Sequence, residues 1–104
     1  MHAEISRHRA ELSVLCQSHG VQRLEIFGSA ARVADFDASR SDADFLVTFT
    51  PVARNDLAAF IDFKDALETL LGRAVDLVER DAVETSRNYI RRRAILGEAQ
   101  AVYG

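Results

Sequence analysis

Cysteine and long hydrophobic runs are scarce in this sequence, and each shortage excludes a class of protein. Cys16 is the only cysteine, so the chain cannot form an intramolecular disulfide or a cysteine-rich metal site. Its place on a predicted apolar helix face favours a small buried side chain over a nucleophile. No apolar stretch approaches the length of a membrane span, and the N-terminus lacks a signal-peptide core. We therefore expect a cytoplasmic protein that has no membrane segment.

Positive charge is also in short supply. The chain has 13 basic and 16 acidic residues, a formal net charge of −3 and a pI near 5.5. Proteins that bind long nucleic acids usually carry a basic surplus or a basic stripe, so we do not expect nucleic acid to be the main partner. The exception is a group of four arginines near the C-terminus. They could form a solvated helix face or contact a nucleotide phosphate, an acidic partner or RNA: Arg87, Arg91, Arg92 and Arg93.

The chain length limits the organisation of the protein. We expect the 104 residues, 48% of them hydrophobic, to form a single domain over 1–104 with one core. Such a domain has little room for separate catalytic and acceptor-binding parts. If the protein is an enzyme, a partner protein or a second copy in a homodimer could supply part of the substrate site.

Hydrophobic spacing and turn residues predict alternating helices and strands. The expected elements are a helix over 3–19, a strand over 21–27, a helical turn over 30–33, a strand over 43–49, a helix from residue 55 or 56 to 71, a strand over 74–79 and a helix from about residue 81. This order indicates an α/β fold in which a small mixed sheet is flanked by helices.

The two later helices have apolar residues that we expect to face the core. In the helix that ends at residue 71 these are Leu57, Ile61, Leu67, Leu70 and Leu71. In the C-terminal helix they are Tyr89, Ile90, Ile95, Leu96 and Val102. Asn55 or Asp56 is suited to cap the first of these helices, and Gly72 is suited to end it.

Three carboxylates lie inside or beside otherwise apolar strands: Asp42, Asp44 and Asp76. Aspartate is depleted in strands, and burying it without a partner is costly. Asp42 and Asp44 are two residues apart at the start of a strand, so their side chains should share one face. If the third strand adjoins the second, Asp76 completes a cluster suited to one or two Mg²⁺ or Mn²⁺ ions. Each acid alone could instead bind backbone amides or an arginine.

A phosphate site is expected at Gly28 and Ser29, which follow a strand and precede a helical turn. Glycine lets the backbone approach a phosphate closely, and amides at a helix start bind anions well. The Ser29 hydroxyl could donate to a phosphate oxygen, and Arg32 could add positive charge. A single Gly-Ser pair after a strand is usually a plain turn, so the prediction depends on the order of all the motifs.

Taken together, these motifs resemble the polymerase-beta-like nucleotidyltransferase superfamily: Gly-Ser, then Asp-x-Asp, then a third acid on a later strand. Here the motifs read Gly28-Ser29, Asp42-Ala43-Asp44 and Val75-Asp76-Leu77-Val78. Within that superfamily the chain is similar to the minimal nucleotidyltransferases, the antitoxins that are paired with a HEPN-domain ribonuclease toxin. The chain departs from the family pattern at Val33, where glycine is usual.

The resemblance implies an activity and a role for each motif. Asp42 and Asp44 would hold Mg²⁺ on the triphosphate of ATP, and Asp76 would share a metal and help to deprotonate the attacking hydroxyl. Gly28 and Ser29 would bind the β and γ phosphates. Members of this family transfer AMP from ATP to a tyrosine of the HEPN toxin, which silences it and releases pyrophosphate. Positioning and charge neutralisation provide most of the catalysis in such a transfer.

Two alternatives remain open at the level of the sequence. The same fold could transfer a nucleotide to a small molecule or to an RNA end, although such enzymes usually carry extra domains for the acceptor. The chain could also be a non-catalytic antitoxin that blocks its toxin by direct binding. The intact set of carboxylates favours catalysis.

Overall fold

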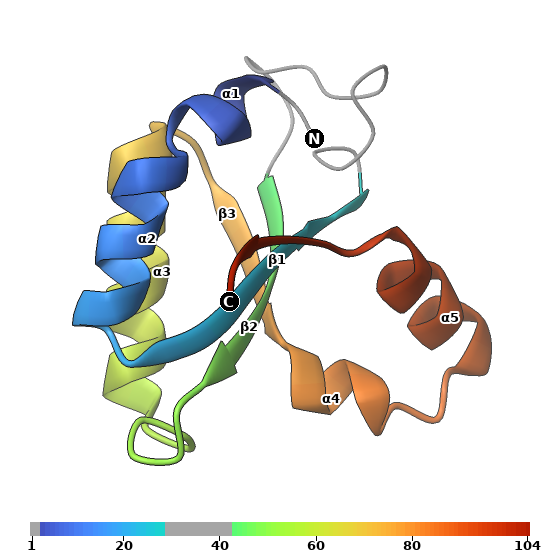
Figure 1. Cartoon of the computed structure of the whole chain (residues 1–104). Coiled ribbons are helices and arrows are strands. Elements are labelled where there is room, and N and C mark those ends of the chain that lie inside the picture. The colour runs from blue at the N-terminus through green and yellow to red at the C-terminus, as the bar shows by residue number, and fades with distance from the viewer. Residues whose placement is uncertain (1–2, 29–42) are drawn as a thin grey trace.

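The computed structural model describes residues 3–28 and 43–104, which form a four-stranded sheet with helices on both sides (Figure 1). The helices are α1 (Ala3–Arg7), α2 (Arg9–Ser18), α3 (Leu57–Leu71), α4 (Arg80–Glu84) and α5 (Tyr89–Glu98). The strands are β1 (Val21–Phe27), β2 (Ala43–Phe49), β3 (Val75–Glu79) and β4 (Gln100–Tyr103). Within the described ranges, none of the helices combines the length and the apolar character needed to cross a bilayer.

The strands are ordered β3-β2-β1-β4, and the sheet is mixed, as the sequence predicts. Strand β1 is antiparallel to both β2 and β4, whereas β3 is parallel to β2. A parallel neighbour needs a crossover connection, and here α3 provides it between β2 and β3. The expected α/β fold with a small mixed sheet is therefore confirmed.

One face of the sheet carries the main hydrophobic core. Helices α2 and α3 cover this face, while α4 and α5 lie on the opposite side (Figure 1). Every other residue of β2 points into the core because side chains alternate along a strand. The fully buried residues with large side chains on this face include Leu12, Phe45, Phe63 and Leu67. We call it the closed face.

Helix α3 has the ends that the sequence predicts. The Asp56 side chain accepts a hydrogen bond from the Ala59 backbone N–H, and Gly72 ends the helix in the left-handed conformation. The predicted inward face is partly wrong, because Leu57 is 71% exposed and Ile61 is 47% exposed. The residues that α3 buries lie on the stripe Phe63, Leu67 and Leu71, spaced by four. With this stripe packed against the core, Ile61 faces outward.

The N-terminal helix predicted over 3–19 is two helices in the structure, α1 and α2, with a break at His8. The His8 N–H still donates to the Ile5 carbonyl, which closes the first short turn. Ile5 and Leu12 are both fully buried. The change of direction at His8 places α1 across the upper end of α2 in Figure 1, so both residues reach the core.

The C-terminal prediction is also wrong in part, because the single helix expected from about residue 81 is α4, α5 and the strand β4. Tyr89 and Ile90 are 57% and 79% exposed rather than inward. Ile95 and Val102 are buried as expected, but Val102 lies in a strand.

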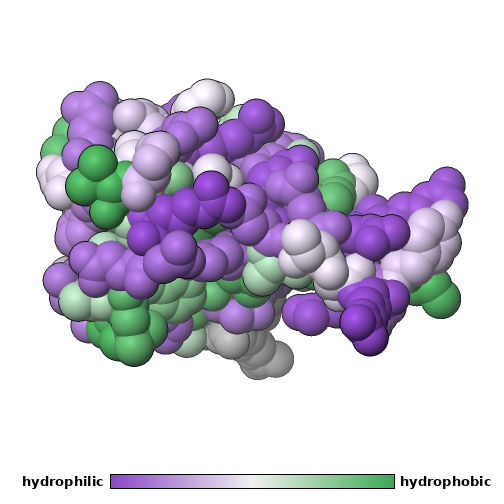
Figure 2. All heavy atoms as spheres, turned by 90° about the horizontal axis from the view of Figure 1, so that it is seen from below, coloured by the Kyte–Doolittle hydropathy of each residue, from purple (hydrophilic) through white to green (hydrophobic). Residues whose placement is uncertain are grey.

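Figure 2 shows a mostly hydrophilic face of the molecule on which hydrophobic residues form separate patches.

Candidate active site

Two of the predicted acids lie directly opposite each other in the sheet. Asp44 in β2 pairs with Asp76 in β3, and each is the second residue of its strand. Directly opposite residues have their side chains on the same face, close enough for like charges to repel. Asp44 is half-buried and Asp76 is exposed. The condition that the third strand adjoins the second is therefore met, and the pairing places these two residues opposite each other.

The acid pair is on the side of the sheet away from the main core. Ala43 and Phe45, which flank Asp44, belong to the closed face, as do Val75 and Leu77, which flank Asp76. Alternation therefore places both acids on the α4–α5 side, which we call the open face. A smaller core occupies part of the open face, and its buried members are Phe27, Leu46, Val83 and Ile95.

Gly28 lies against the Asp44 carboxylate. Gly28 follows Phe27, the last residue of β1, and Phe27 is the register partner of Asp44. Gly28 has φ +66°, and an added Cβ would lie 2.6 Å from Asp44 Oδ2. Glycine suits this position for two reasons: the left-handed backbone and the closeness of the Asp44 carboxylate, which a Cβ would displace. The group that borders Gly28 among the described residues is the Asp44 carboxylate, and the binding of a phosphate at Gly28 stays a prediction.

The backbone of Gly28 also contacts α5. Its N–H donates to Glu98 Oε2 at 3.2 Å, and Glu98 is the last residue of the helix. Sequence reasoning missed Glu98. A glutamate at a helix end is unremarkable, and its contact with residue 28 joins positions 70 residues apart. Only the tertiary structure reveals the pair.

A second charged contact connects α4 to the sheet on the open face. Glu25 in β1 is only 3% exposed, and both of its carboxylate oxygens accept from Arg80 Nη1, at 2.6 and 2.7 Å. Arg23 Nε lies 3.4 Å from Glu25 Oε1. The hydrogen bond to Glu25 raises the pKa of the Arg80 guanidinium, which remains charged. Glu25 is therefore a buried acid whose charge is balanced by Arg80.

The other predicted site residues lie outside the described residues. They are Asp42, Ser29 and Arg32, and Val33 lies in the same stretch. Among the residues that the structure does describe, no three histidine, cysteine, aspartate or glutamate side chains are grouped so that they could hold a metal ion. The described part of the chain therefore contributes two of the three predicted carboxylates and the first residue of the predicted phosphate site.

The arginine group near the C-terminus makes local contacts on α5. Arg92 donates to the Ser86 carbonyl at 3.0 Å, and its guanidinium carbon lies 5.7 Å from the centre of the Tyr89 ring. Arg93 donates to the Tyr89 hydroxyl at 3.0 Å. Arg87, Arg91 and Arg93 are exposed. These contacts fit a solvated helix face, which was one of the predicted interpretations.

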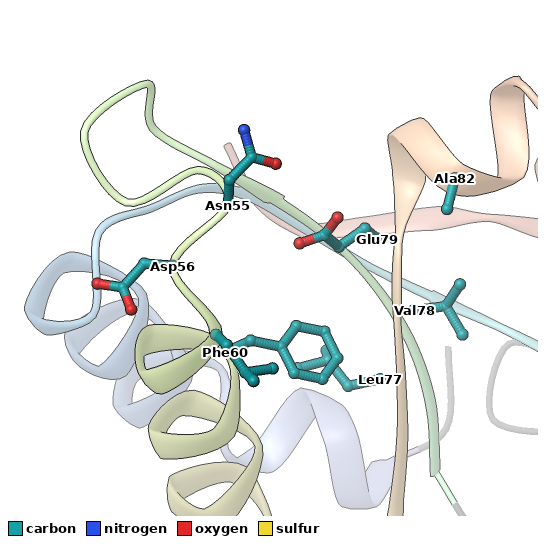
Figure 3. Close-up of a pocket in the computed structure, with 8 residues that line it drawn as sticks. Asn55, Asp56, Phe60, Leu77, Val78, Glu79 and Ala82 are labelled. Atoms are coloured by element: carbon teal, nitrogen blue, oxygen red, sulfur yellow. The ribbon is translucent and has the colours of Figure 1, made fainter.

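A cavity of about 420 Å³ opens beside the edge strand β3, between the start of α3 and α4 (Figure 3). Its lining is mainly apolar and comprises Asn55, Asp56, Leu57, Phe60, Leu77, Val78, Glu79 and Ala82. Figure 3 shows the ring of Phe60 beside Leu77, with the Glu79 carboxylate above them. The acid pair and Gly28 are not among the lining residues, so the cavity is distinct from the candidate site.

The comparisons with known proteins agree with this fold. The model of the nucleotidyltransferase domain family matches residues 9–99. A protein of Methanocaldococcus jannaschii described as a putative protein adenylyltransferase is 37% identical over 78 residues, which cover 73% of this chain and 74% of the relative. A solved structure described as a putative minimal nucleotidyltransferase is 35% identical and covers 96% of this chain and 95% of its own, with a TM-score of 0.72.

More distant solved structures share the fold. One is a complex of a tri-AMPylated Shewanella oneidensis HEPN toxin with an MNT antitoxin. It matches with 17% identity and a TM-score of 0.63, covering 96% of this chain and 72% of the matched one. Another is a toxin–antitoxin complex with AMP-PNP, at 18% identity and a TM-score of 0.66, covering 92% and 73%. The family match over most of the chain, together with the two closer relatives, shows that this protein belongs to the nucleotidyltransferase domain family.

Proposed function

We propose that this protein is a Mg²⁺-dependent protein adenylyltransferase, which transfers AMP from ATP to a tyrosine of a HEPN-type toxin and so acts as its antitoxin. The observation that carries the proposal is the pairing of Asp44 with Asp76 on the open face, beside the tight approach of Gly28. The identity of 37% to a relative described as a protein adenylyltransferase supports the choice of a protein acceptor.

The donor set fits a divalent cation. Asp44 and Asp76 are opposite neighbours of the same charge, and a cation between two such carboxylates would relieve their repulsion. Hard carboxylate oxygens suit Mg²⁺, which usually keeps the remaining positions for water and phosphate oxygens. Asp42, two residues before Asp44, would be the third ligand. A metal bound there would neutralise the charge of the triphosphate and of the leaving pyrophosphate.

The residues of the chain supply the remaining chemistry. The Gly28 amide, with Ser29 and Arg32, would bind the β and γ phosphates and orient the α-phosphorus of ATP. The tyrosine oxygen attacks that phosphorus while the bond to the bridging oxygen of pyrophosphate breaks, and the tyrosine proton passes to Asp76. Because Asp76 is exposed, an acceptor side chain can reach it from solvent. Bringing the acceptor hydroxyl to within reach of the α-phosphorus accounts for much of the rate.

Intact mass spectrometry of the partner toxin tests the proposal. The toxin is incubated with this protein, ATP and Mg²⁺, and we expect a gain of one or more AMP masses. The gain should disappear with EDTA and in the Asp44→Asn and Asp76→Asn variants. Asp65→Asn is the matched control, because Asp65 is an exposed residue of α3 and is not part of the site.

The result also separates the alternatives. Tight binding that neutralises the toxin without any mass gain, and equally in the Asp44→Asn variant, would contradict the proposal in favour of a contact-only antitoxin. Pyrophosphate release from ATP that depends on RNA or on a small molecule, and not on the toxin, would instead point to a different acceptor.

A further inference from the structure

The proposed phosphate-binding amide already has an acceptor within the protein. The Gly28 N–H donates to Glu98 Oε2 at 3.2 Å. Glu98 is half-buried, and its carboxylate approaches the glycine at which the nucleotide phosphates are proposed to bind. The Asp44 carboxylate borders the same glycine, because a Cβ there would lie 2.6 Å from Asp44 Oδ2. Gly28 therefore has two carboxylates close to it.

The position of Glu98 is set by the fold. Helix α5 ends at this residue, and β4 begins two residues later, where Gln100 pairs with Ile26 of β1. Ile26 is in turn two residues before Gly28, which directly follows the end of β1. In Figure 1 the end of α5 lies beside the end of β1, as this register requires. The register of β4 on β1 thus holds the end of α5 beside Gly28, and a rotation of the Glu98 side chain would break the hydrogen bond.

A carboxylate oxygen and a phosphate oxygen compete for the same donor. Both are anionic acceptors that bind a backbone N–H strongly. A single N–H cannot form a full hydrogen bond to both, and two anions placed side by side repel each other. A phosphate can therefore take the Gly28 amide only if the Glu98 carboxylate leaves it.

We propose that Glu98 is an internal competitor of the nucleotide, whose carboxylate occupies the Gly28 amide until the triphosphate displaces it and so lowers the affinity of the site for ATP. This inference rests on the proposed function, because it takes Gly28 as a phosphate-binding residue. The apparent affinity of such a site equals the affinity of the free amide multiplied by the fraction of molecules in which the amide is free.

The competition predicts a specific order of affinities. Glu98→Ala removes the competing acceptor and should bind a triphosphate roughly tenfold more tightly than the natural protein. Glu98→Gln keeps an oxygen acceptor but removes the charge, so its affinity should lie between the two. AMP has no β or γ phosphate, so its weaker binding should be the same in all three proteins.

Calorimetric titration of the full chain with α,β-methylene-ATP and Mg²⁺ tests the inference, because the α–β bridge of this analogue resists cleavage. Asp65→Asn, on the closed-face helix α3, removes one negative charge far from the site and should leave the affinity unchanged. Thermal melts followed by circular dichroism check that each variant is folded. Tighter binding of the triphosphate by Glu98→Ala, with AMP binding and the Asp65→Asn variant unchanged, is the expected result.

Two results would overturn the inference in distinguishable ways. In the first, the natural protein and Glu98→Ala both bind the triphosphate, and the variant binds it no more tightly than the natural protein. Glu98 then supports the Gly28 backbone and does not compete, while the proposed function stands. If neither the natural protein nor the variant binds the triphosphate, the proposed function fails together with the inference.

Discussion

The two faces of the sheet differ in the side chains that they carry. The closed face, beneath α2 and α3, is a continuous apolar core in which Phe45 and Phe63 are fully buried. The open face has a smaller core and carries three strand acids: Glu25, Asp44 and Asp76. One of them, Glu25, is buried and paired with Arg80, whereas Asp44 is half-buried and Asp76 is exposed.

The difference shows how a chain of this size combines stability with chemistry. Because side chains alternate along a strand, β2 uses Ala43 and Phe45 for the core and Asp44 for the candidate site. Stability should therefore depend mainly on one face and activity on the other. The predictions below test this division, from the largest expected effect to the smallest.

The largest effect should follow Asp44→Asn or Asp76→Asn on the open face. Each substitution keeps the shape but removes a charge proposed to balance the phosphates, so the rate of AMP transfer should fall by about a thousandfold. The free energy of unfolding should change by less than about 1 kcal/mol, because the side chains are not part of the core. Radiolabel transfer and urea unfolding measure the two quantities. A variant that unfolds easily but transfers AMP normally would show that the acids are structural.

On the closed face, Phe63→Ala should lower the free energy of unfolding by about 3–5 kcal/mol, because it leaves a cavity in the core. Ile61→Ala on the same helix is the control, with an expected loss below about 1 kcal/mol, since Ile61 is 47% exposed. If Phe63→Ala is too unstable to purify, Phe63→Leu should show a smaller loss in the same direction. Equal losses at positions 61 and 63, measured by urea unfolding, would contradict the division of the faces.

Two glycines with nearly the same backbone provide a matched comparison between site and scaffold. Gly28 and Gly72 have φ of +66° and +65°, so an alanine at either should cost about 1–2 kcal/mol of stability. A Cβ at Gly72 meets nothing within 4 Å, whereas at Gly28 it would collide with Asp44. Gly28→Ala should therefore also slow AMP transfer by roughly tenfold or more, and Gly72→Ala should not. Similar transfer rates in both variants would mean that the rate of AMP transfer does not depend on the position of the Asp44 side chain.

The smallest effect is expected at Cys16 on the closed face. Burial raises the pKa of the Cys16 thiol from 9.0 to about 12, because the charged thiolate is poorly solvated there. The folded protein therefore favours the neutral thiol. This contribution to stability is complete below about pH 9 and is lost as the pH rises from 9 towards 12. Urea unfolding at pH 8 and pH 10 should show a loss in the natural protein that is smaller in Cys16→Ala. An equal loss in both proteins would contradict the assignment to Cys16.

Much of this structure could be predicted because its signals are local. Strands β1 and β2 have the bounds predicted from the alternation and the apolar run of their sequences, and Asp56 and Gly72 cap α3 as predicted. The expectation of a nucleotidyltransferase was also local, since it depended on short motifs, and the family match confirms it. The roles of all the predicted site residues remain predictions: Gly28, Ser29, Arg32, Asp42, Asp44 and Asp76.

The errors occurred where tertiary contacts override local preference. The segment that forms β4 spans four residues, too few for a clear pattern, and becomes a strand because β1 offers it an edge to pair with. The apolar side chains of Tyr89 and Ile90 predict an inward position, but α5 instead buries Ile95 against the open-face core. His8 breaks a helix that spacing alone would continue.

The sequence by itself indicated most of the elements, the family and the candidate acids, because helical and strand periods and motif spacing are properties of neighbouring residues. Only the tertiary structure decided which side chains meet. It placed Asp44 opposite Asp76, paired Arg80 with Glu25 across 55 positions and brought Glu98 to Gly28 across 70. These contacts depend on strand order and register, which follow from how the whole core packs and not from any short segment.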